Sequence, residues 1–304
     1  MSAVSESVTG RITLGDLADR YGFDLTPPFA ANVTITSLAD DAESVSPGAL
    51  LVVTSPDEAD AARLGEAANR GAYAVLVPSA FDGRLPDLDI PVLYGDPDGE
   101  CLGRLAAQIC GSPANAMAVF AVMGTDDASI EENAHVAATL LHTLGNPVAV
   151  IGADGSLSLE RHLNLRYPLG ILDVESTLAV CAEDGAAAVV IALNTRTLRD
   201  GALNGVNVDV LGQDCAQGDS LERVMGQEAA DRYGFVIDDQ THLTGFTEES
   251  DQLAMQSVSS GVPENDRRLS LAIAMVMAAG VRRANIRNAL RVSRDISEMK
   301  RDAG

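Results

Sequence analysis

The chain has almost no lysine. Lys300 is the one lysine among its 304 residues, and Lys and Arg together number 21. Reactions that need a lysine in a loop or a buried pocket are therefore excluded for every position before Lys300. Asp and Glu number 44, which gives a formal net charge of −23. A surface with this charge repels nucleic acid and anionic membranes, so we expect neither as a partner.

Cysteine pairs and long apolar segments are also missing. The four cysteines contain no C-x-x-C pair, so neither a zinc site nor a disulfide framework is indicated. The apolar, charge-free run 269–281 is shorter than the ~20 residues that cross a bilayer. The N-terminus lacks the basic and apolar regions of a signal peptide. We expect a cytoplasmic protein with no membrane insertion, and a hydrophobic content of 46% indicates a folded one.

The first third of the chain mixes short helices and strands. Periodic apolar residues closed by glycine predict helices, and apolar runs bounded by turn residues predict strands. The expected helices are 13–22, 55–70 and 99–109, and the expected strands are 33–37, 50–54, 72–78 and 90–94. A Gly-Ser-Pro sequence at 111–113 indicates a hinge. We therefore place a domain boundary between residues 112 and 113.

The remaining residues, 113–304, alternate strands with helices. Strands are predicted at 119–123, 148–151, 187–193, 206–211 and 235–237, and helices at 131–144, 174–184, 220–232, 267–279 and 283–290. The acidic segment 248–251 is interpreted as a solvated loop. Alternation of this kind predicts a mainly parallel sheet with helices on both faces. The apolar helix at 269–277 is either enclosed in this domain or partly in contact with another subunit.

The segment from Ala118 to Glu132 reads as strand, tight turn and helix start. In α/β proteins such a junction binds phosphate, because glycine-rich turns let backbone N–H groups converge on an anion at a helix N-terminus. Here the turn carries Asp126 and Asp127, and no lysine.

Five segments follow one another along the chain: 36–50 with a Pro-Gly turn, the helix-to-strand passage 67–76, the turn at Gly124 and Thr125, the strand segment 144–152 and the apolar helix 271–280. Together they resemble the Mur ligases, ATP-dependent enzymes of peptidoglycan synthesis, and above all the MurE type, UDP-N-acetylmuramoyl-tripeptide synthetase. The segment 36–50 is similar to the opening D-S-R-x-V-x-P-G-D-L-F motif, and 67–76 to the helix-to-strand passage. Gly124 and Thr125 match the beginning of G-T-N-G-K-T-T. The segment 144–152 is similar to the strand after the phosphate-loop helix, and 271–280 to the last helix of the central domain. The resemblance implies an α/β fold: a small N-terminal α/β domain at 1–112, then a P-loop-type central domain with a mainly parallel sheet at 113–304.

The phosphate loop departs from the family pattern. Asp126 and Asp127 replace its Asn and second Gly, Ala128 replaces its Lys, and Ser129 replaces its first Thr. The lysine would supply a point charge to the β- and γ-phosphates, and the glycine would let the backbone approach them. Ser129-x-x-Glu132 has the pattern of a capping box that occupies the N–H groups of a helix start. We interpret the loop as a capped helix start, in which none of the positions Gly124 to Ser129 binds a cofactor.

Other positions that the resemblance makes functional differ as well. The family's E-V-S-S segment, with a magnesium-binding Glu, falls on 193–196 without a carboxylate, and N-L-S-x-D-H falls on 210–215, which keeps Asp214 and places Cys215 at the His. The uridine-binding D-S-R becomes Asp41-Ala42-Glu43. A carbamylated lysine is impossible before Lys300. Because the chain stops where the family's third domain would start, we also expect that domain to be absent.

Other clusters of reactive residue types carry a weaker signal. His135 and His142 share a helix face, which we interpret as a packed or rim face rather than a metal or catalytic site. The acidic pair Asp238 and Asp239 is typical of a solvated surface. Cys215 is the thiol to test for reactivity, although we interpret it as a buried inert cysteine. We therefore predict no catalytic residue, no metal site and no cofactor.

The sequence thus predicts a catalytically inactive Mur-ligase-like protein, a pseudoenzyme that binds a protein of cell-wall synthesis or cell division, or another copy of itself. Two alternatives stay open. Thr125, Ser129 and Asp214 could retain a phosphate or magnesium site of a nucleotide binder, with UDP-muramyl precursors recognised by the first domain. Alternatively, the chain could work as a ligase together with a partner chain.

Overall fold

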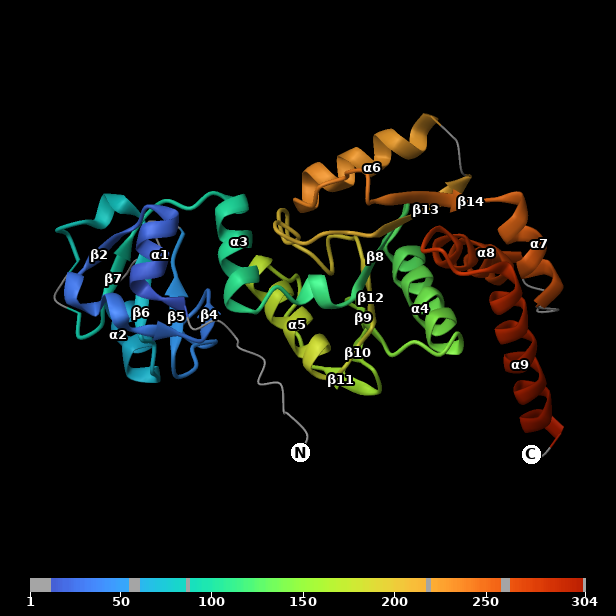
Figure 1. The fold of residues 1–304 in the computed structure, drawn as a ribbon, viewed down its shortest axis with the longest axis horizontal. Helices are drawn as coiled ribbons and strands as arrows, with labels where there is room; N and C mark the ends of the chain where they lie inside the picture. Colours follow the sequence, from blue (N-terminus) through green and yellow to red (C-terminus); the bar gives the residue numbers. More distant parts are fainter. Residues whose placement is uncertain (1–11, 55–60, 86–87, 217–219, 258–262, 303–304) are drawn as a thin grey trace, which may run out of the picture. The chain divides into compact units, whose positions relative to one another are not determined.

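In the computed structural model the chain forms two compact units, Met1–Ser112 and Pro113–Gly304. The structure describes residues 12–54, 61–85, 88–216, 220–257 and 263–302. Among these residues, no helix is both long enough and apolar enough to span a bilayer. Each unit is described separately below (Figure 1).

The first unit contains a five-stranded sheet with strand order β2-β7-β6-β5-β4. Three of its four pairings are parallel, and β2 is antiparallel to β7. The strands are β2 (Asp24–Thr26), β4 (Ser37–Ala39), β5 (Ala49–Val52), β6 (Ala74–Val77) and β7 (Val92–Tyr94), and a separate pair is formed by β1 (Ile12–Thr13) and β3 (Thr34–Ile35). Its α-helices, among the residues that the structure describes, are α1 (Leu14–Tyr21), α2 (Ala61–Arg70) and α3 (Gly99–Ile109).

Helix α1 forms as its end residues predict. The Thr13 side chain accepts a hydrogen bond from the Asp16 N–H, and Asp16 accepts one from the Thr13 N–H, which makes a capping box. Gly22 ends the helix with φ 72°, a left-handed conformation that glycine adopts without strain. The predicted helix 55–70 is confirmed from Ala61 onward, and its first six residues lie outside the described ones.

The second unit is built on a seven-stranded sheet with strand order β11-β10-β9-β12-β8-β13-β14. The strands are β8 (Ala118–Met123), β9 (Val148–Ile151), β10 (Ser156–Ser158), β11 (Arg161–Leu163), β12 (Ala188–Ala192), β13 (Val210–Ala216) and β14 (His242–Phe246). The pairings β9–β12, β12–β8, β8–β13 and β13–β14 are parallel. Strand β10 is antiparallel to both of its neighbours, β9 and β11. The central strands read as continuous apolar runs because both of their faces are buried.

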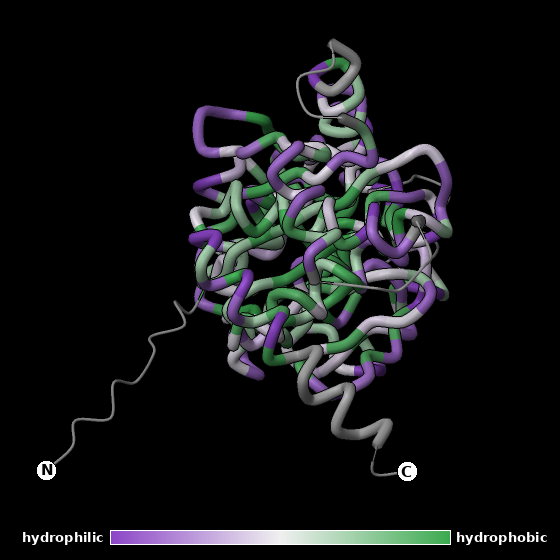
Figure 2. Tube along the Cα trace, turned by 90° about the vertical axis from the view of Figure 1, so that its right-hand side faces the viewer, coloured by the Kyte–Doolittle hydropathy of each residue, from purple (hydrophilic) through white to green (hydrophobic). Residues whose placement is uncertain are grey.

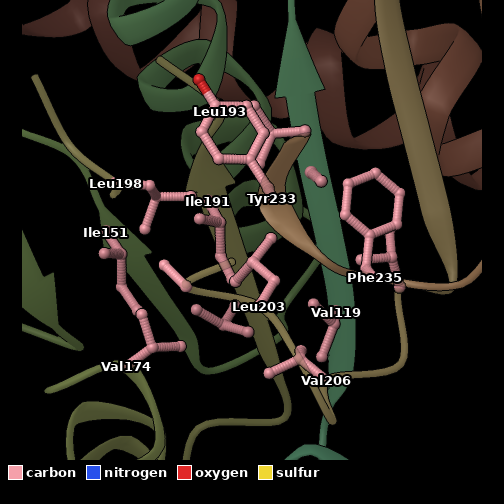
Figure 3. Close-up of a cluster of buried hydrophobic side chains, with 14 of the residues drawn as sticks. Val119, Ile151, Val174, Ile191, Leu193, Leu198, Leu203, Val206, Tyr233 and Phe235 are labelled. Atoms are coloured by element: carbon pink, nitrogen blue, oxygen red, sulfur yellow. The ribbon is translucent and has the colours of Figure 1, made fainter. Parts of the chain in front are cut away.

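Helices cover both faces of this sheet. Val119 and Ile191 point into a core with α5 (Ile171–Glu183) and α6 (Ser220–Tyr233), where Figure 3 shows Leu203, Tyr233 and Phe235 closing around them. The neighbouring strand residues point to the other face, which is covered by α4 (Asp127–Thr143), α7 (Glu248–Ser257), α8 (Pro263–Ala278) and α9 (Arg283–Asp302). Figure 2 shows the resulting separation of apolar inner segments from hydrophilic outer turns. The apolar segment of α8 lies in this second core, with Leu271, Ile273, Met275 and Val276 buried.

The α/β fold class, with mainly parallel sheets, is confirmed, but two predicted elements are wrong and the bounds of a third are shifted. The segment 235–237 forms only an isolated bridge from Val236 to Asn207, and the edge strand is β14 instead. The segment 248–251 is the first turn of α7, where three acidic residues favour the helix N-terminus, and not a loop. The strand predicted at 206–211 begins at Val210. The β10–β11 hairpin was missed because each of its strands has only three residues.

Candidate functional site

At the junction between β8 and α4, an aspartate side chain accepts a hydrogen bond from a backbone N–H of the helix start. Asp126 is the N-cap of α4, and its Oδ1 accepts a hydrogen bond from the Ser129 N–H at 2.9 Å. That backbone hydrogen bond, with a weaker one from the Ser129 hydroxyl, holds the pKa of Asp126 below its usual range. The carboxylate therefore occupies an N–H that faces out of the helix start, where a bound anion would accept it.

The predicted capping box of Ser129 and Glu132 is wrong. Ser129 is the third residue of the helix and donates to the cap, so the capping residue lies three positions earlier than expected. Glu132 instead forms an ion pair with Arg268 of α8. Ala128, at the lysine position of the resemblance, is exposed, and so are Thr125 and Asp126.

Gly124 is explained by packing. A Cβ atom at this position would lie 3.3 Å from the Asp214 Cβ and 3.3 Å from the Ile130 Cγ1. Because β13 brings Asp214 beside the end of β8, a side chain larger than that of glycine does not fit without a shift. Packing against Asp214 and Ile130 thus favours glycine here whether or not a ligand approaches it.

Glu131 is the residue of this region that the sequence analysis missed. Its side chain is 1% exposed, and its Oε1 accepts hydrogen bonds from Asn194 Nδ2 at 2.8 Å, Thr197 Oγ1 at 2.7 Å and the Ala153 N–H at 2.9 Å. These donors come from the loops after β9 and β12, so one carboxylate ties α4 to two strand ends. Gly152 makes room for it, since a Cβ there would lie 2.1 Å from Glu131 Oε2.

The site does not have the ligands that a magnesium ion prefers. Asn194 directly follows Leu193, which stands at the position of the magnesium-binding Glu in the resemblance. It donates its amide to Glu131 and accepts from the N–H groups of Arg196 and Thr197. Among the described residues, no group of three or more His, Cys, Asp or Glu side chains is arranged to hold a metal ion. Magnesium is usually held by one or two carboxylates together with waters and substrate phosphates. The Glu131 carboxylate already accepts three hydrogen bonds, and Asp214 pairs with Arg267. These two carboxylates therefore do not fit a magnesium site as they are arranged.

A polar cavity of about 390 Å³ adjoins the same helix start. Thr125, Ser129 and Asp214 line it, together with two arginines that the sequence analysis did not connect to the loop, Arg267 and Arg268. Arg267 pairs with Asp214 at 3.3 Å and stacks over the Phe246 ring at 4.5 Å. These arginines supply positive charge where the resemblance would place a lysine, but both face carboxylates.

Asn133 lies one helical turn beyond Ser129 and lines the same cavity. It is 3% exposed, and its Oδ1 has no hydrogen-bond partner among the described residues. A buried acceptor without a donor costs free energy, so this atom favours a ligand or water that carries a donor.

The other candidates are not brought together into one site. His135 is half-buried and His142 is exposed, and neither belongs to a metal-binding group among the described residues. Cys215 is half-buried, and its Sγ lies 3.8 Å from Gln213 Oε1. Asp238 accepts from the Gln240 N–H at 2.8 Å and so caps a local turn.

No protein-family model matches the chain. A ligase of Pseudomonas aeruginosa, UDP-N-acetylmuramoyl-L-alanyl-D-glutamate–2,6-diaminopimelate ligase, is 26% identical over 192 residues, which is 61% of this chain and 38% of the ligase. The ligase of the same name from Xylella fastidiosa is 30% identical over 189 residues, 60% of this chain and 37% of the ligase. The matched part of the chain thus spans less than two fifths of these relatives.

Solved structures extend the similarity of the fold. A crystal structure of MurF from Acinetobacter baumannii covers 92% of this chain and 68% of its own, with a TM-score of 0.58 and 12% identity. A second structure from that organism, UDP-N-acetylmuramoylalanyl-D-glutamyl-2,6-diaminopimelate–D-alanyl-D-alanyl ligase, has a TM-score of 0.55 and 13% identity. At such identities the likeness concerns the fold alone.

Proposed function

We propose that this chain, a member of the Mur ligase family matched over part of its relatives' length, is a non-catalytic binding protein. It would act in the cytoplasm, in peptidoglycan synthesis or cell division, without the ligase reaction that its relatives are named for. In this proposal residues 1–112 and 113–304 correspond to the family's N-terminal and central domains.

The observation that carries the proposal is the self-closed helix start of α4. Asp126 accepts the Ser129 N–H that a phosphate would otherwise accept, and Asp126 and Asp127 together place two carboxylates at the mouth of the loop. Ala128 offers no cation. A nucleoside triphosphate entering here would meet like charge, and it would have to displace an existing hydrogen bond.

Glu131 supports the same interpretation from inside the protein. Its carboxylate holds the loops after β9 and β12 through neutral donors. Asn194 is thereby used as a structural donor, and Leu193 before it, at the position of the family's magnesium-binding Glu, offers no oxygen ligand. In this proposal the Glu131 carboxylate orders the loops after β9 and β12, so no bound substrate or metal ion is needed to order them.

Turnover is the direct test of the missing catalysis. The chain would be incubated with Mg-ATP, UDP-N-acetylmuramoyl-L-alanyl-D-glutamate and 2,6-diaminopimelate, and released phosphate would be measured. The proposal expects phosphate release equal to that of a protein-free blank. Release that depends on all three compounds would refute it.

The polar cavity beside Ser129 favours a second candidate function, a binder of nucleotides or UDP-muramyl precursors that does not act on them. Arg267, Arg268 and the unpartnered Asn133 Oδ1 could hold a polar ligand there. A thermal-shift screen of nucleotides and UDP-sugars would separate the two functions, because a ligand that binds only the folded state raises the Tm. A rise of several degrees that is lost in Asn133→Leu favours the second candidate.

A further inference from the structure

A larger cavity, of about 610 Å³, lies at the other end of the central sheet. Asn146 and Pro147 line it just before β9 begins, and Asp184 lines it shortly before β12. Because β8, β9 and β12 are parallel, these residues lie at the end of the sheet opposite the β8–α4 junction. The volume falls within the range of roughly 300–1,000 Å³ that small-molecule sites occupy.

The cavity has a negative electrostatic environment. His142, in the last turn of α4, and Asp184, the C-cap of α5, both line it, so two helix C-termini border one space. Each C-terminus carries a partial charge of about −0.5. The Glu160 carboxylate adds a full negative charge at the rim.

Arg161 is the one lining cation, and its charge is already neutralised. Its Nη2 lies 2.5 Å from Asp184 Oδ2, which also accepts from the Ser158 hydroxyl at 2.5 Å. The Ser158 hydrogen bond, with help from Arg161, holds the pKa of Asp184 below its usual range. Glu160 and the two helix ends therefore determine the sign of the field, which favours a cation.

Leu159 forms an apolar wall of the cavity, and its backbone has a positive φ that is strained for leucine. It is the first residue of the two-residue turn between β10 and β11, with φ 55° and 37% of its surface exposed. Glycine or asparagine is the favoured residue at such a position, because a side chain on Cβ is strained there. A leucine retained in this conformation, partly exposed and against a cavity, is accounted for if its side chain contacts a ligand.

We propose that this cavity binds a small organic cation, whose ammonium or guanidinium group lies near Glu160 and the two helix C-termini and whose apolar part packs on Leu159 and Pro147. The proposal is independent of the function proposed above, since it uses none of the residues around Asp126 or Glu131.

The test compares three probes that share a ring and differ in charge: benzylamine, benzyl alcohol and benzoate. The chain has only four histidines, so the imidazole signals in a proton NMR spectrum are few, and a His142→Gln variant assigns the reporter at the cavity. We expect benzylamine to shift the His142 signal saturably, with an affinity at least about fivefold above that of benzyl alcohol. Benzoate should cause no shift.

Two variants localise the binding. Leu159→Gly removes the apolar wall and relieves the positive φ, so it should weaken benzylamine binding by about fivefold without lowering the unfolding midpoint. Glu160→Gln should weaken the binding of benzylamine but not that of benzyl alcohol. Glu100→Gln, an exposed acidic position on α3 in the other unit, is the matched control and should change neither.

Three results would each overturn the proposal: no saturable shift of His142 with benzylamine, equal affinities for benzylamine and benzyl alcohol, or unchanged benzylamine affinity in Leu159→Gly.

Discussion

Two glutamates in the second unit are both buried, but they differ in whether their carboxylates accept hydrogen bonds. Glu131 on α4 is 1% exposed and accepts hydrogen bonds from three neighbours through one oxygen. Glu175 on α5 is 0% exposed, and neither of its carboxylate oxygens has a hydrogen-bond partner among the described residues. Burial without partners raises the pKa of Glu175 to about 7.

The difference separates a structural carboxylate from a titratable one. A buried carboxylate with several donors stabilises the loops that provide them, and removing it leaves those donors unpaired. A buried carboxylate without donors is favoured in its neutral form, so its effect on stability depends on pH. Glu131 therefore stabilises the loops beside the β8–α4 junction, whereas Glu175 makes the stability of the folded protein depend on pH.

The largest effect is expected from Glu131→Ala. The substitution removes the acceptor that Asn194 Nδ2 and the Thr197 hydroxyl share. Each buried donor left unpaired costs about 1–3 kcal/mol, so we expect a loss of about 2–6 kcal/mol. Urea unfolding followed by circular dichroism measures the change. Glu132→Ala, at the adjacent position with a half-exposed ion pair to Arg268, is the control and should cost less than about 1 kcal/mol. Equal losses of stability in Glu131→Ala and Glu132→Ala would contradict the structural role of Glu131.

The second effect concerns Glu175 and pH. The folded-state pKa of about 7 lies above the ordinary value of 4.5, so the folded protein binds this proton more tightly than the unfolded chain does. Stability from this group is thus fully present below about pH 4.5 and is lost as pH rises to about 7, by about 3 kcal/mol in total.

Glu175→Gln isolates this contribution, because every other titrating group is common to both proteins. The free energy of unfolding of the variant minus that of the wild type should rise between pH 4.5 and pH 7 and then level off. A difference that is constant with pH would show that Glu175 has a partner or is solvated.

The smallest effect is expected at Asp126, the exposed counterpart of Glu131. Asp126→Ala removes the cap of α4 and should lower the Tm by about 2–4 °C. The pKa of Asp126 is lowered in the folded protein, chiefly by the Ser129 N–H, so its contribution is present above its ordinary value of 3.8 and is lost as pH falls. Asp126→Asn, which can still cap the helix, should keep most of the wild-type Tm at pH 7. A Tm of Asp126→Ala equal to that of the wild type would show that the cap is not formed.

Much of the architecture could be predicted because its signals are local. The Thr13 and Gly22 ends of α1, the apolar runs of β8 and β9 and the bounds of α3 follow from neighbouring residues. The wrong elements are those whose structure depends on distant partners. β14 forms because it pairs with β13, and Phe235 packs in the core without joining the sheet.

The site could be predicted only in part for the same reason. The lack of a lysine in the loop is visible in the sequence, but the donors around Glu131 come from residues 22–66 positions away. One local signal was available, since Glu131 shares a helix face with the buried Ala134 and Ala138. The approach of Arg267 and Arg268 to Ser129 depends on the packing of α8 against α4, which spacing along the chain does not reveal.

Isothermal titration calorimetry with Mg-ATP tests the closed loop most directly. The wild type and the double variant Asp127→Gly/Ala128→Lys would be measured side by side, because the variant restores the glycine and lysine of the family motif but leaves Asp126 and Glu131 in place. The account predicts no binding tighter than about 1 mM (roughly −4 kcal/mol) for either protein. Micromolar binding by the wild type would contradict it.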